Sequence, residues 1–288
     1  MTMEDRPLFG AGNVSWRVLR QPIYLLGGMR ALLLQLAHPN VAEGVLQHSD
    51  FVGDVFGRTR RTLDLMLMVG LGEREQADAA LERMHAVHAR VRGTLPDGSA
   101  YDARDPELQL WVLATLIDTV LVVEERFLGE FGPEDRRRYY LESCQVARVF
   151  GIPEELIPPD LDTFRRYVDR HLDTLEVSDT AQRLSRFVLR PRFRFLPDLV
   201  FVPFRLVTAE MLPERLRAAY GLRRGWWRRR AVKMVERLTR AVVPRLPESV
   251  RTFPVLHPAL GLRYRLRQVA GRVRRRREPP GRPFEPAA

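Results

Sequence analysis

The chain has 288 residues, 45% of them hydrophobic and 29% charged, a balance that excludes a largely disordered protein and allows one large domain or two small ones. Its single cysteine, Cys144, excludes an internal disulfide, the paired-cysteine attachment of a c-type haem and a cysteine-rich zinc site, and it fits a reducing compartment. The net charge of +11 comes almost entirely from arginine, which is concentrated in 222–230 and 271–278. A GC-rich genome would explain this preference for arginine, and attraction to anionic lipid or nucleic acid would explain the positive charge.

The first third of the chain shows apolar residues at helical spacing. A helix is predicted over about 17–36, where the Gly27-Gly28 pair would permit either a close contact or a kink, and His38-Pro39 would end it. Gly93 is the expected C-cap of a later helix, and the sequence after it, "TLPDGSAYDARD", is expected to be a loop with a Pro-Asp-Gly turn. The other helices predicted in this third lie at about 40–48, 54–72 and 74–93.

The middle third begins with a strong helix start signal. Asp105 as an N-cap, followed by Pro106, predicts a helix over about 106–127. Its apolar run, 110–123, is interrupted by Asp118 and is shorter than the roughly 20 residues of a bilayer-spanning helix. Further helices are predicted at about 133–150, 160–174 and 178–189.

The last third contains a connector punctuated by proline, 190–203, and two further predicted helices, 204–222 and 226–243. Alternating β-branched residues are scarce along the whole chain, and neither an internal repeat nor a glycine-rich linker occurs. The predicted fold class is therefore all-α. The expected organisation is an N-terminal segment (1–15), one multi-helix globular domain (16–270) and a disordered Arg-rich tail (271–288).

Several familiar motifs are missing from the sequence. It contains no phosphate-cradling glycine loop, no Gly-x-Ser-x-Gly elbow and no His-Glu-x-x-His, which disfavours kinase and dehydrogenase chemistry. The first residues, "MTMEDRPLFGAGNVSW", contain acids and no apolar core, unlike a signal peptide. We therefore expect a cytoplasmic protein, peripheral to the membrane if its Arg-rich last third binds anionic lipid.

Two histidines in "LERMHAVHARVRG" are the first candidate site. His85 and His88 are three residues apart and share a helical face. They flank a predicted buried stripe formed by Leu81, Met84, Val87 and Val91. Three interpretations are open: an axial haem ligand, a half-site of a di-iron centre built from Glu82 and His85, or histidines that fill a core. Spacing alone favours the core interpretation, and no second Glu-x-x-His unit accompanies the first.

Three further groups of residues are candidates. Arg58, Arg61 and Thr62 share a helix face beside apolar residues, which suits an apolar ligand with carboxylates, such as haem, or simply a solvated basic face. His38 lies at a helix break, where its ring would point into a cavity or form part of a turn. Glu43 follows on the next predicted helix.

Five stretches occur together in one order: "MRALLLQLAHPNVAEGVLQHSDF", "GRTRRTLDLML", "HARVRGTLPDGSAYDARDPELQLWVLATLIDT", "EERF" and "MLPERLRAAYGL". In this order and spacing the chain resembles the family of the latex-clearing rubber oxygenase and the oxygenase of mycophenolic acid biosynthesis, over about residues 15–255. The resemblance implies an all-α protein with a globin-like helical core. It also implies non-covalently bound haem b and the cleavage of carbon–carbon double bonds in polyisoprenoids by dioxygen.

The resemblance also assigns residues. His88 matches the family's axial histidine, with His85 as the second choice, and Arg58, Arg61 and Thr62 match an Arg-x-x-Lys-Thr arrangement near the distal side of the haem. Arg61 replaces the lysine of that motif, which puts a removable distal ligand in doubt because arginine stays charged and ligates iron poorly.

A second departure from the family pattern concerns Leu113. It stands where many bacterial relatives have histidine, so a step that depends on that histidine is altered or lost. Thr115 and Thr119 lie on the same helix, near where a pocket threonine is expected, and Glu43 lies where an oxygenase base is expected.

Two functions follow from these observations. The first is a haem b oxygenase for an isoprenoid or lipid-like substrate, with a channel lined by the helices at 17–36 and 106–127 and with the Arg-rich last third on an anionic membrane. The second is a non-catalytic lipid- or haem-binding protein in which Leu113 marks lost chemistry. Nucleic-acid binding is disfavoured because the sequence contains no recognisable DNA-binding module.

Overall fold

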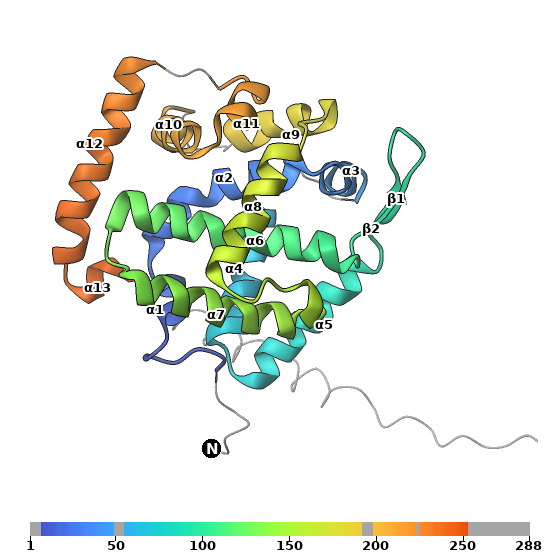
Figure 1. Ribbon diagram of the computed structural model, residues 1–288, viewed down its shortest axis with the longest axis horizontal. Coiled ribbons are helices and arrows are strands. Elements are labelled where there is room, and N and C mark those ends of the chain that lie inside the picture. The colour runs from blue at the N-terminus through green and yellow to red at the C-terminus, as the bar shows by residue number, and fades with distance from the viewer. Residues whose placement is uncertain (1–6, 49–54, 192–197, 223–224, 253–288) are drawn as a thin grey trace, which may run out of the picture. The chain divides into compact units, whose positions relative to one another are not determined.

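The computed structural model describes residues 7–48, 55–191, 198–222 and 225–252. The chain forms two compact units, residues 1–246 and 247–288, and the second is described only over 247–252, where α13 (Glu248–Arg251) lies. Apart from one short hairpin, the regular structure of the described residues is helical, which confirms the all-α prediction (Figure 1). The predicted tail, 271–288, lies outside the described residues, and the globin-like character of the core stays a prediction.

The predicted helix over 17–36 is three elements. These are α1 (Val14–Arg20), the 3₁₀ turn η2 (Pro22–Gly27) and α2 (Gly28–Ala37). The prediction of one continuous helix was wrong because Pro22 has no N–H to donate to the preceding turn, so it ends α1 and begins η2. Gly27 makes the close contact that its lack of a side chain permits, since a Cβ there would lie 2.2 Å from Cγ2 of Thr119.

The next elements are α3 (Pro39–His48), α4 (Val55–Leu71), α5 (Arg74–His88), β1 (Arg92–Thr94) and β2 (Ala100–Asp102). Gly93 was expected as the C-cap of a helix, but α5 ends at His88, and Gly93 pairs with Tyr101 in the antiparallel hairpin β1–β2. A Cβ at Gly93 would lie 2.8 Å from the Tyr101 hydroxyl, so glycine lets that ring lie across the strand. The expected loop is therefore the tip and second strand of a hairpin.

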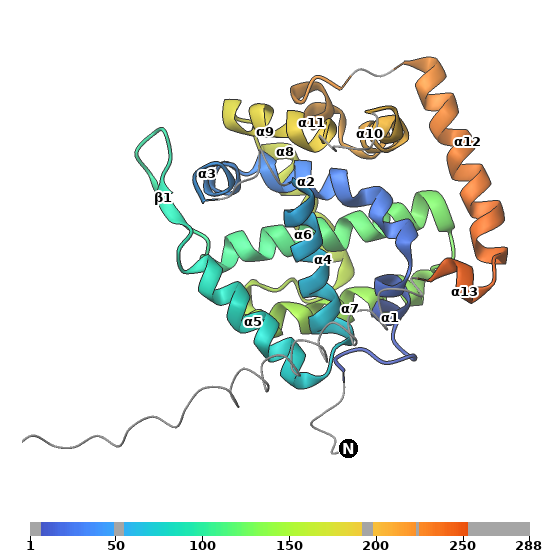
Figure 2. The same cartoon turned by 180° about the vertical axis from the view of Figure 1, so that it is seen from behind.

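Helix α6 (Pro106–Val123) runs through the middle of the first unit (Figures 1 and 2). The predicted cap is confirmed, because the Asp105 carboxylate accepts a hydrogen bond of 2.9 Å from the backbone N–H of Glu107. The helix continues into a π-helical turn, η3 (Glu124–Leu128). The segment 106–128 is long and apolar enough to cross a membrane, but 56% of its most apolar window is buried inside the fold, as in a core helix.

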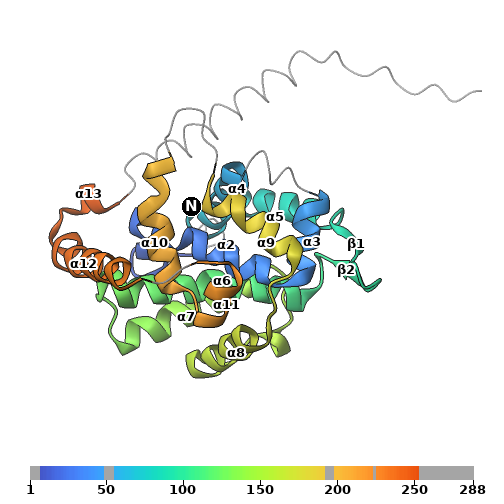
Figure 3. The ribbon, with the colours of Figure 1, turned by 90° about the horizontal axis from the view of Figure 1, so that it is seen from above.

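The remaining elements of the first unit complete the layers around α2 and α6. Helices α9 and α10 pack against α2, whereas α7 and α8 pack against α6, and Figure 3 shows α8 on the opposite side of α6 from α9. The predicted helix over 204–222 was wrong because Pro213 divides it. The bounds are α7 (Pro133–Val149), η4 (Glu154–Leu156), α8 (Leu161–Thr174), α9 (Asp179–Leu189), η5 (Asp198–Phe201), α10 (Val202–Met211), α11 (Glu214–Ala219), α12 (Trp226–Val242) and η6 (Val243–Arg245).

Candidate functional site

The two histidines of α5 differ in burial. His88, the last residue of the helix, is half-buried and its Nδ1 atom is buried, whereas His85 is exposed, with Nε2 3.5 Å from the carbonyl oxygen of Phe150. The predicted buried stripe was wrong at Val87, which is 59% exposed, because α5 buries only the side that faces its neighbours. His88 is therefore the more enclosed of the two candidate ligands.

Helix α4 carries the predicted basic residues and packs along α5 (Figure 2). Arg61 is exposed and Thr62 is half-buried, whereas the side chain of Arg58 lies outside the described residues. Because α4 and α5 are consecutive helices joined by a short turn, the end of α5 that carries His88 lies toward the beginning of α4. The sequence prediction that these residues border one site is thus compatible with the order of the two helices.

Glu43 lies on the buried side of α3. Its Oε2 atom accepts a hydrogen bond of 3.3 Å from Nε2 of Gln47, and Oε1 of Gln47 accepts one of 2.8 Å from the Tyr101 hydroxyl. Burial, together with the nearby Glu43 carboxylate, raises the pKa of Tyr101. Glu43 is thus the inner end of a polar chain that ties α3 to the hairpin.

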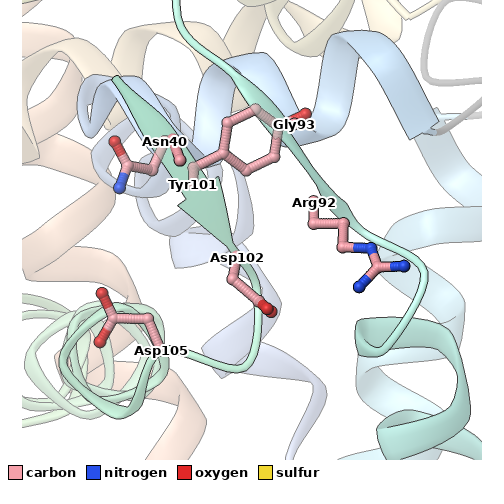
Figure 4. A pocket seen from close by; sticks show the side chains of 7 residues that line it. Asn40, Arg92, Gly93, Tyr101, Asp102 and Asp105 are labelled. Carbon is pink, nitrogen blue, oxygen red and sulfur yellow. The ribbon is translucent and has the colours of Figure 1, made fainter.

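A surface cavity of about 570 Å³ lies beside these hydrogen-bonded side chains, between the hairpin and the start of α6 (Figure 4). Hydrogen bonds from Arg104 lower the pKa of Asp102, on its wall, to about 2, so that this carboxylate is charged at neutral pH. The wall combines polar and charged side chains with apolar surface. It is formed by Asn40, Arg92, Gly93, Ala100, Tyr101, Asp102 and Asp105.

The two threonines proposed for the cofactor face α2. Thr119 Oγ1 accepts a hydrogen bond of 2.6 Å from Arg30, and Thr115 Oγ1 accepts one of 3.1 Å from Gln35. Arg30 also forms a 2.6 Å ion pair with Asp118 and donates to the carbonyl oxygen of Met211, although it is only 3% exposed. These faces of α2 and α6 are filled by each other's side chains and form core, and the predicted substrate route along them stays a prediction.

Leu113 lies on another side of α6. It is buried in the hydrophobic cluster that also contains Val69 of α4 and Cys144 of α7. The position at which many relatives were expected to carry histidine is thus occupied by a side chain that packs as core.

His38 caps α2 near a group of aromatic residues that sequence reasoning missed. Burial and the charge of His171 lower the pKa of His38, against a smaller opposing effect of Asp105. His171 stacks on Trp111, with ring centroids 4.9 Å apart, and its Nδ1 lies 2.9 Å from the carbonyl oxygen of Tyr167. His171 stood alone in a polar stretch of sequence, so only the tertiary fold reveals this group.

Residues 16–244 match the family described as ER-bound oxygenase mpaB/B'/Rubber oxygenase, catalytic domain. The chain belongs to this oxygenase family. Two relatives, uncharacterized proteins of Mycobacterium bovis and Mycobacterium tuberculosis, are each 30% identical over 222 residues, which cover 72% of this chain and 86% of the relative. No solved structure matches the chain.

The described residues differ in how well they fit the cofactors that the sequence suggests. Within the described ranges, no group of three or more histidine, cysteine, aspartate or glutamate side chains is placed to hold a metal ion, and both members of the Glu82–His85 pair are exposed. A haem needs only one or two axial ligands, and the half-buried imidazole of His88 is of the right chemical type. Arg61 on the neighbouring helix suits the carboxylates of a porphyrin. Among the described residues, His88 is thus of the type that could bind haem iron, and no cluster of the kind that a di-iron centre needs is present.

Proposed function

We propose that this protein is a haem b-dependent oxygenase that acts with dioxygen on an apolar, isoprenoid or lipid-like substrate. The observation that carries the proposal is the match of residues 16–244 to an oxygenase catalytic domain. The half-buried position of His88 supports it, because a histidine that binds haem iron must reach into the fold in its neutral form.

The proposal gives each residue of the candidate site a role. His88 would hold the haem iron, and bound haem would supply the activation of dioxygen that no side chain provides. Arg61 and Thr62, with Arg58, would donate hydrogen bonds to dioxygen and would place a fixed positive charge beside it. Glu43 would act as a base, held in place by the amide of Gln47.

The test is the absorption spectrum of the full-length protein after haem supplementation, in the oxidised and reduced forms. His88→Ala should lose the Soret band, whereas His85→Ala, an exposed neighbour on the same helix, should keep it. A wild-type protein with a helical circular dichroism spectrum and no Soret band would overturn the proposal. Oxygen consumption with polyisoprenoid and unsaturated lipid substrates then tests turnover.

A second function is favoured by the packing of Leu113. Because this residue fills the core where a histidine was expected, the protein would bind haem or lipid without catalysis if the reaction depends on that histidine. A normal Soret band without substrate-dependent oxygen uptake distinguishes this alternative from the first.

A further inference from the structure

Helix α12 has an unusual distribution of exposed side chains. It lies at the margin of the first unit in two perpendicular views (Figures 1 and 3). Trp226 is 72% exposed, and the other large hydrophobic residues that this helix exposes are Trp227, Met234, Val235, Leu238 and Val242. Trp227, Met234 and Leu238 recur at helical spacing and so form one stripe.

A basic face lies next to this stripe. The helix contains six basic residues and one acid, and the exposed basic residues are Arg229, Arg230, Lys233, Arg237 and Arg240. The acid, Glu236, is turned inward and forms a 2.5 Å ion pair with Arg126 of η3. The outward charge of α12 is therefore uniformly positive.

The helix is attached firmly to the rest of the unit. Val232 is buried in a cluster with Phe127 of η3 and Met211 of α10. Arg240, although exposed, donates a hydrogen bond to the carbonyl oxygen of Glu125, which ties the C-terminal part of the helix to η3. The exposed stripe is consequently a surface that the fold presents outward.

The beginning of α12 also forms a hollow of about 400 Å³. Arg229, Arg230 and Lys233 line it together with Trp226 and Gly225. The guanidinium group of Arg230 lies 5.1 Å from the ring centre of Trp226, so that a cation and an aromatic ring are held side by side. Such a hollow suits a phosphate group at the level where tryptophan favours the membrane interface.

We infer that α12 is a membrane-docking helix that lies in the surface of an anionic bilayer, with its apolar stripe among the acyl chains and its basic residues on the phosphates. An anionic bilayer is the partner that fits both features, because its phosphates complement the basic residues and its acyl chains accept the apolar stripe. The basic face or the apolar stripe alone would also suit other partners. The inference concerns the same protein as the proposed oxygenase, but it does not depend on haem, so each can fail without the other.

The experiment measures binding of the full chain to vesicles of phosphatidylcholine alone and of phosphatidylcholine with phosphatidylserine. Wild type should bind the anionic vesicles. The double variant Trp227→Ser, Leu238→Ser should bind on the order of tenfold or more weakly, whereas Leu199→Ser, an exposed leucine outside α12, should not change binding. Arg229→Gln and Arg237→Gln should each weaken binding about fivefold, whereas Arg90→Gln and Arg186→Gln, exposed arginines on other parts of the unit, should have smaller effects.

Two results would overturn the inference. One is anionic-vesicle binding that Trp227→Ser, Leu238→Ser leaves unchanged, because the charge of the remaining chain would then account for it. The other is an absence of vesicle binding together with a dimer, in sedimentation without lipid, that the same variant dissociates, because the stripe would then bind a second copy. Circular dichroism and the Soret band serve as controls for folding and for the haem site.

Discussion

Helix α2 carries Arg30 near its beginning and is capped by His38 at its end, and the fold buries these two polar side chains in different ways. Arg30 is almost completely buried, yet it donates hydrogen bonds to the Met211 carbonyl and Thr119 and forms an ion pair with Asp118. His38, by contrast, has a buried Nδ1 atom for which the described residues supply no hydrogen bond.

The difference shows two ways of burying a polar group. A guanidinium cannot lose its charge, so the chain surrounds it with acceptors. An imidazole can become neutral, so burial next to His171 is accommodated by a lowered pKa. The guanidinium keeps its charge at every ordinary pH, whereas the imidazole makes stability depend on pH.

The largest change in stability is expected on substitution of Arg30. Arg30→Met should lower the free energy of unfolding by about 3 kcal/mol, because it leaves Asp118 and two other acceptors without their donor. Chemical denaturation measures this change. Arg74→Met, which removes an exposed ion pair with Asp78, is the matched control and should cost less than about 0.5 kcal/mol. Equal effects would show that the Arg30 network contributes no more than a surface pair.

A smaller effect is expected where η2 passes the same part of α6. Gly27→Ala should destabilise the protein by about 1–3 kcal/mol, because the new Cβ would lie 2.2 Å from Cγ2 of Thr119. Gly28→Ala, where no atom lies within 4 Å of the new Cβ, should be neutral or slightly stabilising.

A double variant isolates the contact. Thr119→Ser removes the clashing methyl group and keeps the hydroxyl that accepts from Arg30, so it should restore much of the stability of Gly27→Ala in thermal or chemical denaturation. If the changes in unfolding free energy caused by Gly27→Ala and Thr119→Ser simply add in the double variant, the Thr119 methyl group is not the source of the clash.

The sequence predicted the parts of the fold that depend on local signals. The Asp105-Pro106 start of α6 is confirmed because capping involves neighbouring residues. Two predicted helices are each divided in the structure, because Pro22 and Pro213 interrupt otherwise continuous apolar patterns. The hairpin was missed because three-residue strands are too short to show alternation. The need for glycine at position 93 was also not visible, because the Tyr101 ring contacts it only once the hairpin has formed.

The candidate site was predictable to a similar extent. The spacing of His85 and His88 alone favoured core histidines, and only the family resemblance selected His88, which is half-buried in the fold. Thr115 and Thr119 were also selected, but their hydroxyls bond to Gln35 and Arg30, which lie about 80 and 89 residues away along the chain. The sequence did contain a signal for the contact at Arg30, because Arg30 and Asp118 are opposite charges inside apolar segments. Spacing alone could not show that these two residues pair.

The smallest expected effect is at the titratable end of α2. Because the pKa of His38 is lowered in the folded state, the unfolded chain binds a proton first as the pH falls below about 6.5, the ordinary value for histidine. Stability should therefore decrease from that pH down to the lowered pKa, by about 1.4 kcal/mol for each unit of displacement, and should not decrease further below it. Denaturation curves between pH 5 and 7.5 should show this decrease in wild type and in His85→Gln, an exposed control, and a shallower one in His38→Gln. Parallel curves for all three proteins would mean that His38 reaches a proton acceptor or water in the folded state, and that the two ends of α2 do not differ in the way their contacts indicate.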